Sequence, residues 1–275
     1  MKIAILQMTA GIDPAANAAV VIYAVREAKA GGADVLFTPE MSNMLDRNRA
    51  RAAATIQTEA DDTMLAAVRN AARASGLWVH LGSLALKGEA SSDKWRNRGF
   101  VIAPDGSIAA RYDKIHLFDV DLPTGESWRE SSVYRGGDQA VAVRLPQAVL
   151  GLSICYDVRF AAVYAALSRA GADIVAVPAA FTVPTGHAHW HVLLRARAIE
   201  SACFIVAAAQ TGTHQDGRST FGHSLVVDPW GDVLLDMGEA PGLGFADLAL
   251  DQIADVRARV PVIANRRPVA DAVQP

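Results

Sequence analysis

Short apolar runs alternate along the chain with longer, Ala-rich segments in which apolar residues recur at helical spacing. Several of these segments end at a glycine, which commonly terminates a helix because it adopts left-handed backbone angles without a steric penalty. Helices are predicted over residues 17–30, 63–75, 161–169 and 189–202, and buried strands over 3–7, 34–37, 78–84, 174–177 and 204–208. This alternation predicts an α/β fold.

Other β-type runs occur in pairs that are separated by only a few residues. Asp105-Gly106 stands between two such runs, and Asp-Gly is a strong turn signal in that position. Hairpins or strand pairs are predicted over 99–103 with 108–112, 141–144 with 149–154, and 224–228 with 233–236. The chain is therefore expected to combine hairpins with strands that helices connect.

Residues 28–39 resemble residues 168–178, because each segment consists of a helix end, a glycine, a buried strand and a proline. The repeat predicts two structurally similar halves, although helix-to-strand connections look alike in many α/β proteins. No linker rich in Pro, Gly or Ser separates the halves, so one domain is expected. We assign this domain to residues 1–275, with its core over about 1–262 and a polar, extended tail over 263–275.

The net charge of the chain is −3, its pI is near 6.2, and its lysines and arginines are scattered. This gives no reason to expect binding to nucleic acid or to an anionic membrane. The N-terminal segment turns polar too quickly for a secretory signal, and no apolar stretch reaches membrane-spanning length. Two cysteines argue against a disulfide scaffold and fit a reducing compartment. We therefore expect a cytoplasmic enzyme.

Cys155 lies where an apolar strand ends, a few residues before a predicted helix. Amides at a helix N-terminus lower the pKa of a nearby thiol and can bind a developing oxyanion, so the position suits a nucleophile. The alternative is a buried structural cysteine, which is the commoner role of a cysteine in an apolar strand. Cys203 has only apolar and small neighbours and is interpreted as a packing residue.

Glu40 and Lys114 also lie just past predicted strands. A carboxylate at the mouth of an apolar strand would be partly desolvated, which raises its pKa toward the range of a general base. A lysine ammonium in such a place can stabilise an oxyanion and a thiolate, although each residue alone could be an ordinary surface residue. Since ligands of α/β folds bind at strand ends, Glu40, Lys114 and Cys155 together predict nucleophilic catalysis.

Other chemistries have less support. The chain contains no Gly-x-Ser-x-Gly, Gly-x-Gly-x-x-Gly or Walker motif, so serine-hydrolase and nucleotide chemistry are not indicated. His187, His189 and His191 alternate along the chain and could bind zinc if they lay on a strand. The residues that follow favour a helix, on which only His187 and His191 would be neighbours, and there is no His-Glu-x-x-His motif. Metal binding is therefore the weaker hypothesis.

Three segments occur in the order typical of the nitrilase, or carbon–nitrogen hydrolase, superfamily. They are Thr38-Pro-Glu40, Tyr112-Asp-Lys-Ile-His-Leu-Phe118 and Ile154-Cys-Tyr-Asp-Val-Arg-Phe160. The chain resembles this family over nearly its whole length, and the resemblance implies that Glu40, Lys114 and Cys155 form a catalytic triad. It also implies a second glutamate between the lysine and the cysteine. Glu130 matches that position best, and Glu126 is the alternative.

Further segments resemble the Nit subgroup of this family, which includes deaminated-glutathione amidases and ω-amidases. They are 114–123, 180–190, 194–200, 207–210, 222–231 and 266–268. This resemblance implies a four-layer αββα sandwich, a homodimer or higher homo-oligomer, and no cofactor or metal. It places Phe181, Thr185 and His187 in a substrate-facing loop.

Two residues that follow the nucleophile, Tyr156 and Arg159, are further candidates for substrate binding. The guanidinium of Arg159 could bind a substrate carboxylate bidentately. Ala161 stands where many relatives have a proline, which removes a preset helix start and puts the local loop geometry in doubt.

The resemblance implies an amidase that uses water to cleave a small linear amide bearing carboxylates, through a thioester on Cys155. Deaminated glutathione and the ω-amide of an α-keto acid are the expected substrate types. Hydrolysis of N-carbamoyl compounds or nitriles is the alternative on the same fold. A non-catalytic interaction protein that retains the fold is the alternative of another class.

Overall fold

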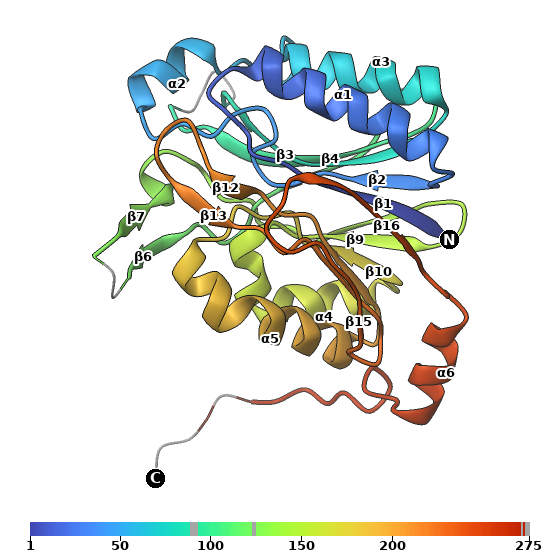
Figure 1. The fold of residues 1–275 in the computed structure, drawn as a ribbon. Helices are drawn as coiled ribbons and strands as arrows, with labels where there is room; N and C mark the ends of the chain where they lie inside the picture. The colour runs from blue at the N-terminus through green and yellow to red at the C-terminus, as the bar shows by residue number, and fades with distance from the viewer. Residues whose placement is uncertain (89–92, 123–124, 271, 273–275) are drawn as a thin grey trace.

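The computed structural model describes residues 1–88, 93–122, 125–270 and 272. Two six-stranded sheets lie face to face, and helices cover the outer face of each sheet (Figure 1). This arrangement confirms the predicted four-layer αββα sandwich. Residues 271 and 273–275 of the predicted tail lie outside the described residues. None of the helices within the described ranges is both long and apolar enough to cross a membrane.

The first sheet has three parallel strands at its centre, with antiparallel strands on either side. Two long helices, α1 (Pro14–Ala30) and α3 (Thr63–Ser75), cover its outer face (Figure 1). In spatial order the strands are β16 (Gly242–Asp247), β1 (Lys2–Gln7), β2 (Val35–Phe37), β3 (Trp78–Leu86), β4 (Arg96–Ile102) and β5 (Ile108–Asp113).

The second sheet has the same plan, with three parallel strands at its centre. Helices α4 (Ala161–Arg169) and α5 (Val183–Ser201) cover its outer face (Figure 1). In spatial order the strands are β15 (Val233–Asp236), β14 (Leu225–Val227), β11 (Phe204–Ala207), β10 (Ile174–Ala176), β9 (Val149–Leu152) and β8 (Val141–Arg144). The predicted strand pairs β4–β5, β8–β9 and β14–β15 are all present.

The repeat seen in the sequence corresponds to matching places in the two sheets. Strands β2 and β10 are each the middle one of three parallel strands, and each follows a helix. Each is also followed closely by a proline, Pro39 or Pro178. Each trio has one antiparallel strand on one side and an antiparallel pair on the other, which supports the prediction of two similar halves.

The central strands are buried on both faces. In β2, Val35 and Phe37 pack in the space between the two sheets, whereas Leu36 packs toward α1 and α3. Successive side chains of a strand point to opposite faces, so one continuous apolar run can supply two layers of core. This explains why β2 reads as a short apolar run without alternation.

Most predicted helices have the expected ends, but α5 does not. Helix α3 ends as predicted at Gly76, which has the left-handed φ of 59°. Helix α5 begins at Val183, six residues before the predicted start at His189. Pro184 lies in the first turn, where its ring holds φ near the helical value. The missing N–H of proline costs nothing at this position, because the first N–H groups of a helix have no acceptor within it. Pro184 therefore favours the earlier start. The expected loop position of Thr185 and His187 is therefore wrong, because both residues lie on α5, whereas Phe181 precedes the helix.

Several short elements were not predicted. The strands of two small ribbons, β6–β7 and β12–β13, lie at one end of the sandwich (Figure 1). Their sequences are short and polar, so they carry no clear strand pattern. The elements that were missed are α2 (Arg49–Thr55), β6 (Asp119–Asp121), β7 (Ser127–Arg129), η1 (Glu130–Ser132), η2 (Cys155–Arg159), β12 (Thr211–Thr213), β13 (Ser219–Phe221), β16 and α6 (Gln252–Arg259).

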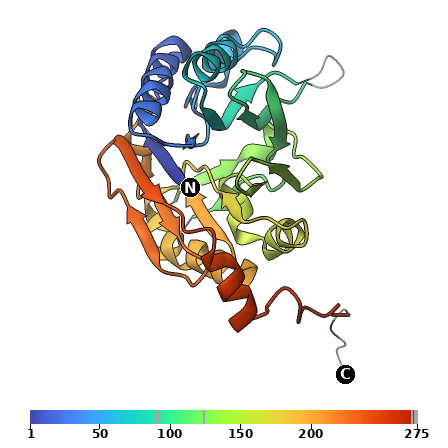
Figure 2. The same ribbon diagram turned by 90° about the vertical axis from the view of Figure 1, so that its right-hand side faces the viewer.

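The segment after α6 leads away from the sheets (Figure 2). Its described residues are mostly exposed, as a polar tail would be. The guanidinium of Arg266 donates to the carbonyl oxygens of Ala165 (3.1 Å) and Glu200 (3.3 Å). These bonds attach the start of the tail to the middle of α4 and to the end of α5.

Candidate active site

Glu40, Lys114 and Cys155 meet at one end of the sandwich. Glu40 follows β2, Lys114 follows β5 directly, and Cys155 follows β9, so the three side chains come from strand ends in both sheets. Their exposed fractions are 4%, 2% and 7%. The structure thus brings together the three residues that the sequence placed at separate strand ends.

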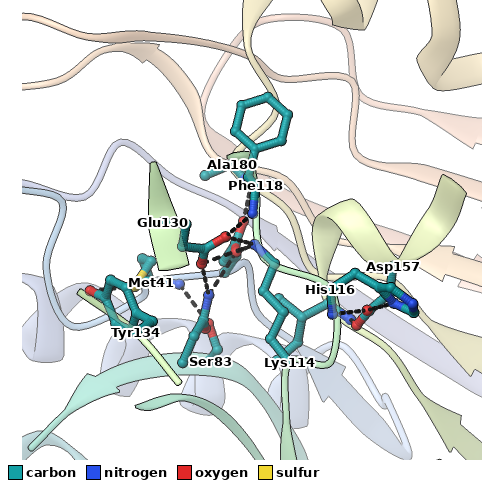
Figure 3. A network of polar contacts seen from close by, with 12 residues as sticks. Met41, Ser83, Lys114, His116, Phe118, Glu130, Tyr134, Asp157 and Ala180 are labelled. Carbon is teal, nitrogen blue, oxygen red and sulfur yellow. Dashed lines mark hydrogen bonds and ion pairs between the residues drawn. The ribbon is translucent and has the colours of Figure 1, made fainter. Parts of the chain in front are cut away.

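Lys114 lies between two carboxylates (Figure 3). Its Nζ donates to Oε1 of Glu40 at 2.9 Å and to Oε2 of Glu130 at 2.8 Å. Nδ2 of Asn97 donates to the same two side chains, at 2.9 Å to Glu40 and 3.2 Å to Glu130. Glu126 is exposed and makes no side-chain contact with Lys114 among the described residues. The geometry therefore places Glu130, rather than Glu126, in the buried cluster.

The loop that carries Glu40 is fixed to strand β3. The backbone N–H of Met41 donates to Oγ of Ser83 at 2.9 Å, and Met41 has a left-handed φ of 55°. Oγ1 of Thr38 accepts a hydrogen bond from the backbone N–H of Gly82 at 3.0 Å. The side chain of Glu40 therefore leaves a loop whose backbone is held at several points.

Cys155 begins the short 3-10 helix η2 with a left-handed φ of 48°, which is unfavourable for a residue other than glycine. Asp157 is fully buried and stabilises this turn, because it accepts hydrogen bonds from the backbone N–H groups of Ile154 (3.0 Å) and His116 (2.9 Å). It also accepts one from the hydroxyl of Tyr112 at 2.7 Å. A sharp strand-to-helix turn of this kind presents a nucleophile to a cleft.

The thiol of Cys155 is neutral at physiological pH. Burial and the neighbouring Glu40 carboxylate raise its pKa well above the ordinary value, and Lys114 offsets this only in part. The expectation that helix amides lower the pKa of this thiol is therefore wrong. The reason is that the sulfur is buried next to a negative charge, and η2 is a single short turn.

The Glu40 carboxylate is ionised at physiological pH. Burial by itself raises its pKa, but the Lys114 ammonium and hydrogen bonds from Lys114, Cys155 and Asn97 outweigh burial, so the net pKa is lowered. The expected rise of this pKa is therefore wrong. Burial by itself lowers the pKa of Lys114, but Glu130 and Glu40 raise it well above its ordinary value. The resting site thus holds a thiol, an ammonium and carboxylates.

A cleft of about 430 Å³ opens over these residues. Among the predicted substrate-binding residues, Tyr156, Phe181 and Thr185 line it, with Thr185 on α5 instead of a loop. Arg159 and His187 are not part of the lining. The guanidinium of Arg159 packs over the rings of Tyr156 (5.8 Å) and Phe181 (5.3 Å), and His187 is an exposed residue of α5.

The three alternating histidines do not converge on one site. They all lie on α5, where His189 contacts Arg159 and His187 packs against the ring of Phe221. His191 instead lies near His223 and Asp236, and their side-chain ligand atoms are within 4.8 Å of one another. The predicted zinc arrangement of His187, His189 and His191 is therefore not formed.

Sequence reasoning missed several residues of the site. Asn97 is the second residue of β4, a buried position between Arg96 and Arg98, so the local sequence held no clear signal for it. Gln210 donates from Nε2 to the carbonyl oxygen of Glu40 at 2.9 Å. Arg47, Trp128 and Arg218 line the cleft from the short segments that carry no clear pattern.

Comparison with known proteins agrees with this geometry. A profile of the carbon–nitrogen hydrolase family matches residues 2–258. The deaminated glutathione amidase of Synechocystis sp. is 49% identical over 172 residues, which cover 62% of this chain and 63% of that protein. The deaminated glutathione amidase of Mus musculus is 39% identical over 269 residues, which cover 97% of this chain and 83% of that protein.

The fold also matches solved structures. The crystal structure of the Caenorhabditis elegans NitFhit protein superposes with a TM-score of 0.89 at 36% identity. The match covers 97% of this chain and 65% of the NitFhit chain. The chain thus spans just under two thirds of the cyanobacterial and nematode proteins that it matches.

Proposed function

Because the chain belongs to the carbon–nitrogen hydrolase family, we propose that it is an amidase that cleaves a small linear amide through a thioester on Cys155. The observation that carries this proposal is the burial of the Cys155, Glu40 and Lys114 side chains together in one cleft. The shifted pKa values favour a neutral thiol beside a carboxylate and an ammonium. These are the groups that nucleophilic attack on an amide requires.

The first half of the reaction forms the thioester. Glu40 accepts the thiol proton as Sγ of Cys155 attacks the carbonyl carbon, and the carbonyl electrons move onto oxygen. The Lys114 ammonium stabilises this oxyanion. When the carbon–nitrogen bond breaks, Glu40 returns the proton to the leaving nitrogen, which departs as ammonia or an amine.

The second half releases the acid. Glu40 accepts a proton from water as the water oxygen attacks the thioester carbonyl carbon. The tetrahedral intermediate collapses, the carbon–sulfur bond breaks, and the proton returns from Glu40 to the Cys155 sulfur. The products are a carboxylic acid and the amine, so one amide and one water are consumed. Glu130 keeps Lys114 in place and charged throughout.

We place the substrates among amides that bear carboxylates, as deaminated glutathione and the ω-amides of α-keto acids do. The names of the cyanobacterial and mouse relatives support the first of these. N-carbamoyl compounds and nitriles are the alternative substrates on this fold, and a non-catalytic interaction protein is the alternative of another class. We also propose that the protein forms a homodimer and is located in the cytoplasm. Light scattering tests the oligomeric state, and cell fractionation tests the location.

A substrate panel tests the proposal. Purified protein is incubated with deaminated glutathione, an ω-amide, an N-carbamoyl amino acid and a nitrile, and released amine, ammonia and carbon dioxide are measured. We expect amide turnover, and a covalent acyl adduct on Cys155 when the quenched reaction is measured by intact mass. The Cys155→Ala variant should show neither.

Matched controls define the outcome. Cys203→Ala removes the other buried cysteine, which has no polar partner among the described residues, and it should turn over amide normally. Full activity of Cys155→Ala would contradict a thioester on that residue. Turnover of the nitrile or carbamoyl compound alone would move the function to that alternative, and a thiol inert to every substrate and to iodoacetamide would favour an interaction protein.

A further inference from the structure

Two arginines and a tryptophan that take no part in the hydrogen bonds of the catalytic cluster meet in the cleft. Arg47 lies in the connection between β2 and α2, Trp128 lies on β7, and Arg218 lies in the turn between β12 and β13. The Cζ atoms of Arg47 and Arg218 lie 4.8 Å and 5.2 Å from the centre of the Trp128 ring. All three side chains line the cleft that contains Cys155.

The two arginine segments are tied together by one buried carboxylate. Oδ2 of Asp216 accepts from Nε of Arg218 at 2.8 Å and from the backbone N–H of Arg47 at 2.9 Å. The Asp216 side chain is only 1% exposed. This arrangement fixes Arg218 and the start of the Arg47 side chain before any ligand is present, which lowers the entropy cost of binding.

The guanidinium of Arg47 has no hydrogen-bond acceptor in the part of the chain that the structure describes. Arg47 is an exposed residue whose guanidinium stacks on the Trp128 ring, and the indole N–H of Trp128 is buried without an acceptor in that same part of the chain. A guanidinium presents its N–H groups in a planar fork that matches a carboxylate. The position therefore suits an anionic group of a ligand.

The charged residues that line the cleft fall into two sets. Glu40 and Glu130 outnumber Lys114 in the catalytic cluster, and they would repel a carboxylate. Among the other lining residues, the arginines outnumber the acidic residues Asp46 and Glu126; the arginines are Arg47, Arg49, Arg129 and Arg218. A substrate that carries a carboxylate and an amide is therefore oriented with its acid toward the arginines and its amide carbonyl toward Cys155.

We infer that Arg47 and Arg218, stacked on Trp128, bind a substrate carboxylate remote from the amide that is cleaved, and so determine the preference for acidic amides. This inference rests on the proposed amidase function and names the residues that recognise its substrate. Arg159, which the sequence also suggested for carboxylate binding, packs on the cleft residues Tyr156 and Phe181 and stays a separate prediction.

A pair of matched substrates tests the inference. Glutaramate carries one amide and one carboxylate, and glutaramide replaces that carboxylate with a neutral amide. In Arg47→Gln and in Arg218→Gln, kcat/KM for glutaramate should fall by about ten- to a hundredfold, mainly through KM, because each lost hydrogen bond involved two charged groups. Ammonia release from glutaramide should change by less than about threefold.

Two further variants separate specific binding of the carboxylate by a planar guanidinium from a nonspecific effect of positive charge. Arg47→Lys keeps the charge without the planar fork, so it should recover only a minor part of the lost preference. Arg144→Gln removes an exposed guanidinium at the end of β8, outside the cleft, and should leave the preference for glutaramate unchanged. Equal losses for both substrates in the Arg47 and Arg218 variants, or an unchanged preference, would overturn the inference.

A binding measurement separates this inference from the proposed reaction. Glutaramate is titrated calorimetrically into Cys155→Ala, with and without Arg47→Gln or Arg218→Gln. Binding that weakens about tenfold or more in the arginine variants supports the carboxylate site, even if the wild-type protein hydrolyses no amide and the proposed function fails. No binding to Cys155→Ala, or equal binding with and without the arginines, would overturn the site.

Discussion

Nζ of Lys114 lies 2.9 Å from Oε1 of Glu40, and both side chains are almost completely buried. Lys114 also contacts Glu130, so one ammonium faces two carboxylates. A buried carboxylate stays ionised only beside such a positive charge or equivalent hydrogen bonds. The proposed base therefore depends on the lysine for its charge as well as for its position.

Replacing Lys114 with Met should cost both activity and stability. The variant leaves Glu40 and Glu130 buried together without their shared ammonium, and breaking a buried ion pair on one side typically costs about 3–5 kcal/mol. We expect a loss of that order in the free energy of unfolding measured with urea, together with loss of amide turnover. Lys29→Met removes an exposed charge from α1 and should change stability by less than about 0.5 kcal/mol. Similar urea midpoints for the two variants would contradict the assignment.

Replacing Glu40 with Gln should reduce kcat while the fold is retained. The amide is nearly isosteric but cannot accept the thiol proton, and general base catalysis contributes about 10²–10⁴-fold. Turnover is measured beside the thermal unfolding midpoint, so that a folding defect is recognised. Glu126→Gln is the comparison, because Glu126 is exposed at the cleft and makes no contact with Lys114 among the described residues. A larger loss in Glu126→Gln than in Glu40→Gln or Glu130→Gln would reverse the roles given to these glutamates.

Alkaline pH should destabilise the fold through its buried thiols. Burial and Glu40 raise the pKa of Cys155 above its ordinary value of 9.0, and burial raises the pKa of Cys203 to about 12. The unfolded chain therefore loses thiol protons near pH 9 while the folded chain keeps them. The stability from each neutral thiol is fully present below that pH and falls as pH rises toward the folded pKa, by on the order of 1 kcal/mol between pH 8 and 10.

Urea unfolding at pH 8 and pH 10 measures this effect. The decrease in unfolding free energy should be smaller in Cys155→Ala, and in Cys203→Ala, than in the wild-type protein. A decrease of the same size in all three proteins would show that the thiols do not contribute. Iodoacetamide should also alkylate Cys155 slowly at neutral pH, since the thiolate is the reactive form.

Replacing Gly82 with Ala should disturb the loop that carries Glu40. A Cβ atom at this position would lie 2.1 Å from the carbonyl oxygen of Thr38 and 2.6 Å from that of Pro39, so the backbone before Glu40 has to move. Overpacking of this kind commonly costs about 1–3 kcal/mol, and we expect turnover to fall with it. The matched control is Gly242→Ala on β16, where a Cβ atom meets nothing within 4 Å. Normal activity and stability of Gly82→Ala would mean that the loop tolerates the shift.

The strand ends that carry the site could be predicted because their signals are local. Strands β2 and β9 are short apolar runs that end close to a proline or a helix start, and β5 was predicted from the Asp105-Gly106 turn that precedes it. The start of α5 is also encoded locally, by Pro184, although the helix was predicted to begin only at His189. The loop position expected for Thr185 and His187 came from the family resemblance, and both residues lie on α5 instead.

The ionisation of the site could not be predicted, because a pKa depends on what surrounds a group in space. The sequence shows that Cys155 and Glu40 end apolar strands, but not that the thiol is buried against this carboxylate. Nor does it show that Lys114 and Asn97 both contact the carboxylate. Both predicted pKa directions were wrong for this reason, although the residues themselves were found.

The layered α/β fold, the ends of most helices and the three residues that the cleft brings together could be predicted from local patterns, since each depends on about ten to twenty residues. The three-dimensional packing was needed to show that Glu130 joins the cluster, that Asn97 and Asp157 fix it, and that Arg47 and Arg218 meet on Trp128. These contacts join segments far apart in the chain, and short polar ribbons acquire their structure from pairing rather than from local propensity. The sequence shows which side chains are available for chemistry, whereas the charge states of those side chains depend on how they pack.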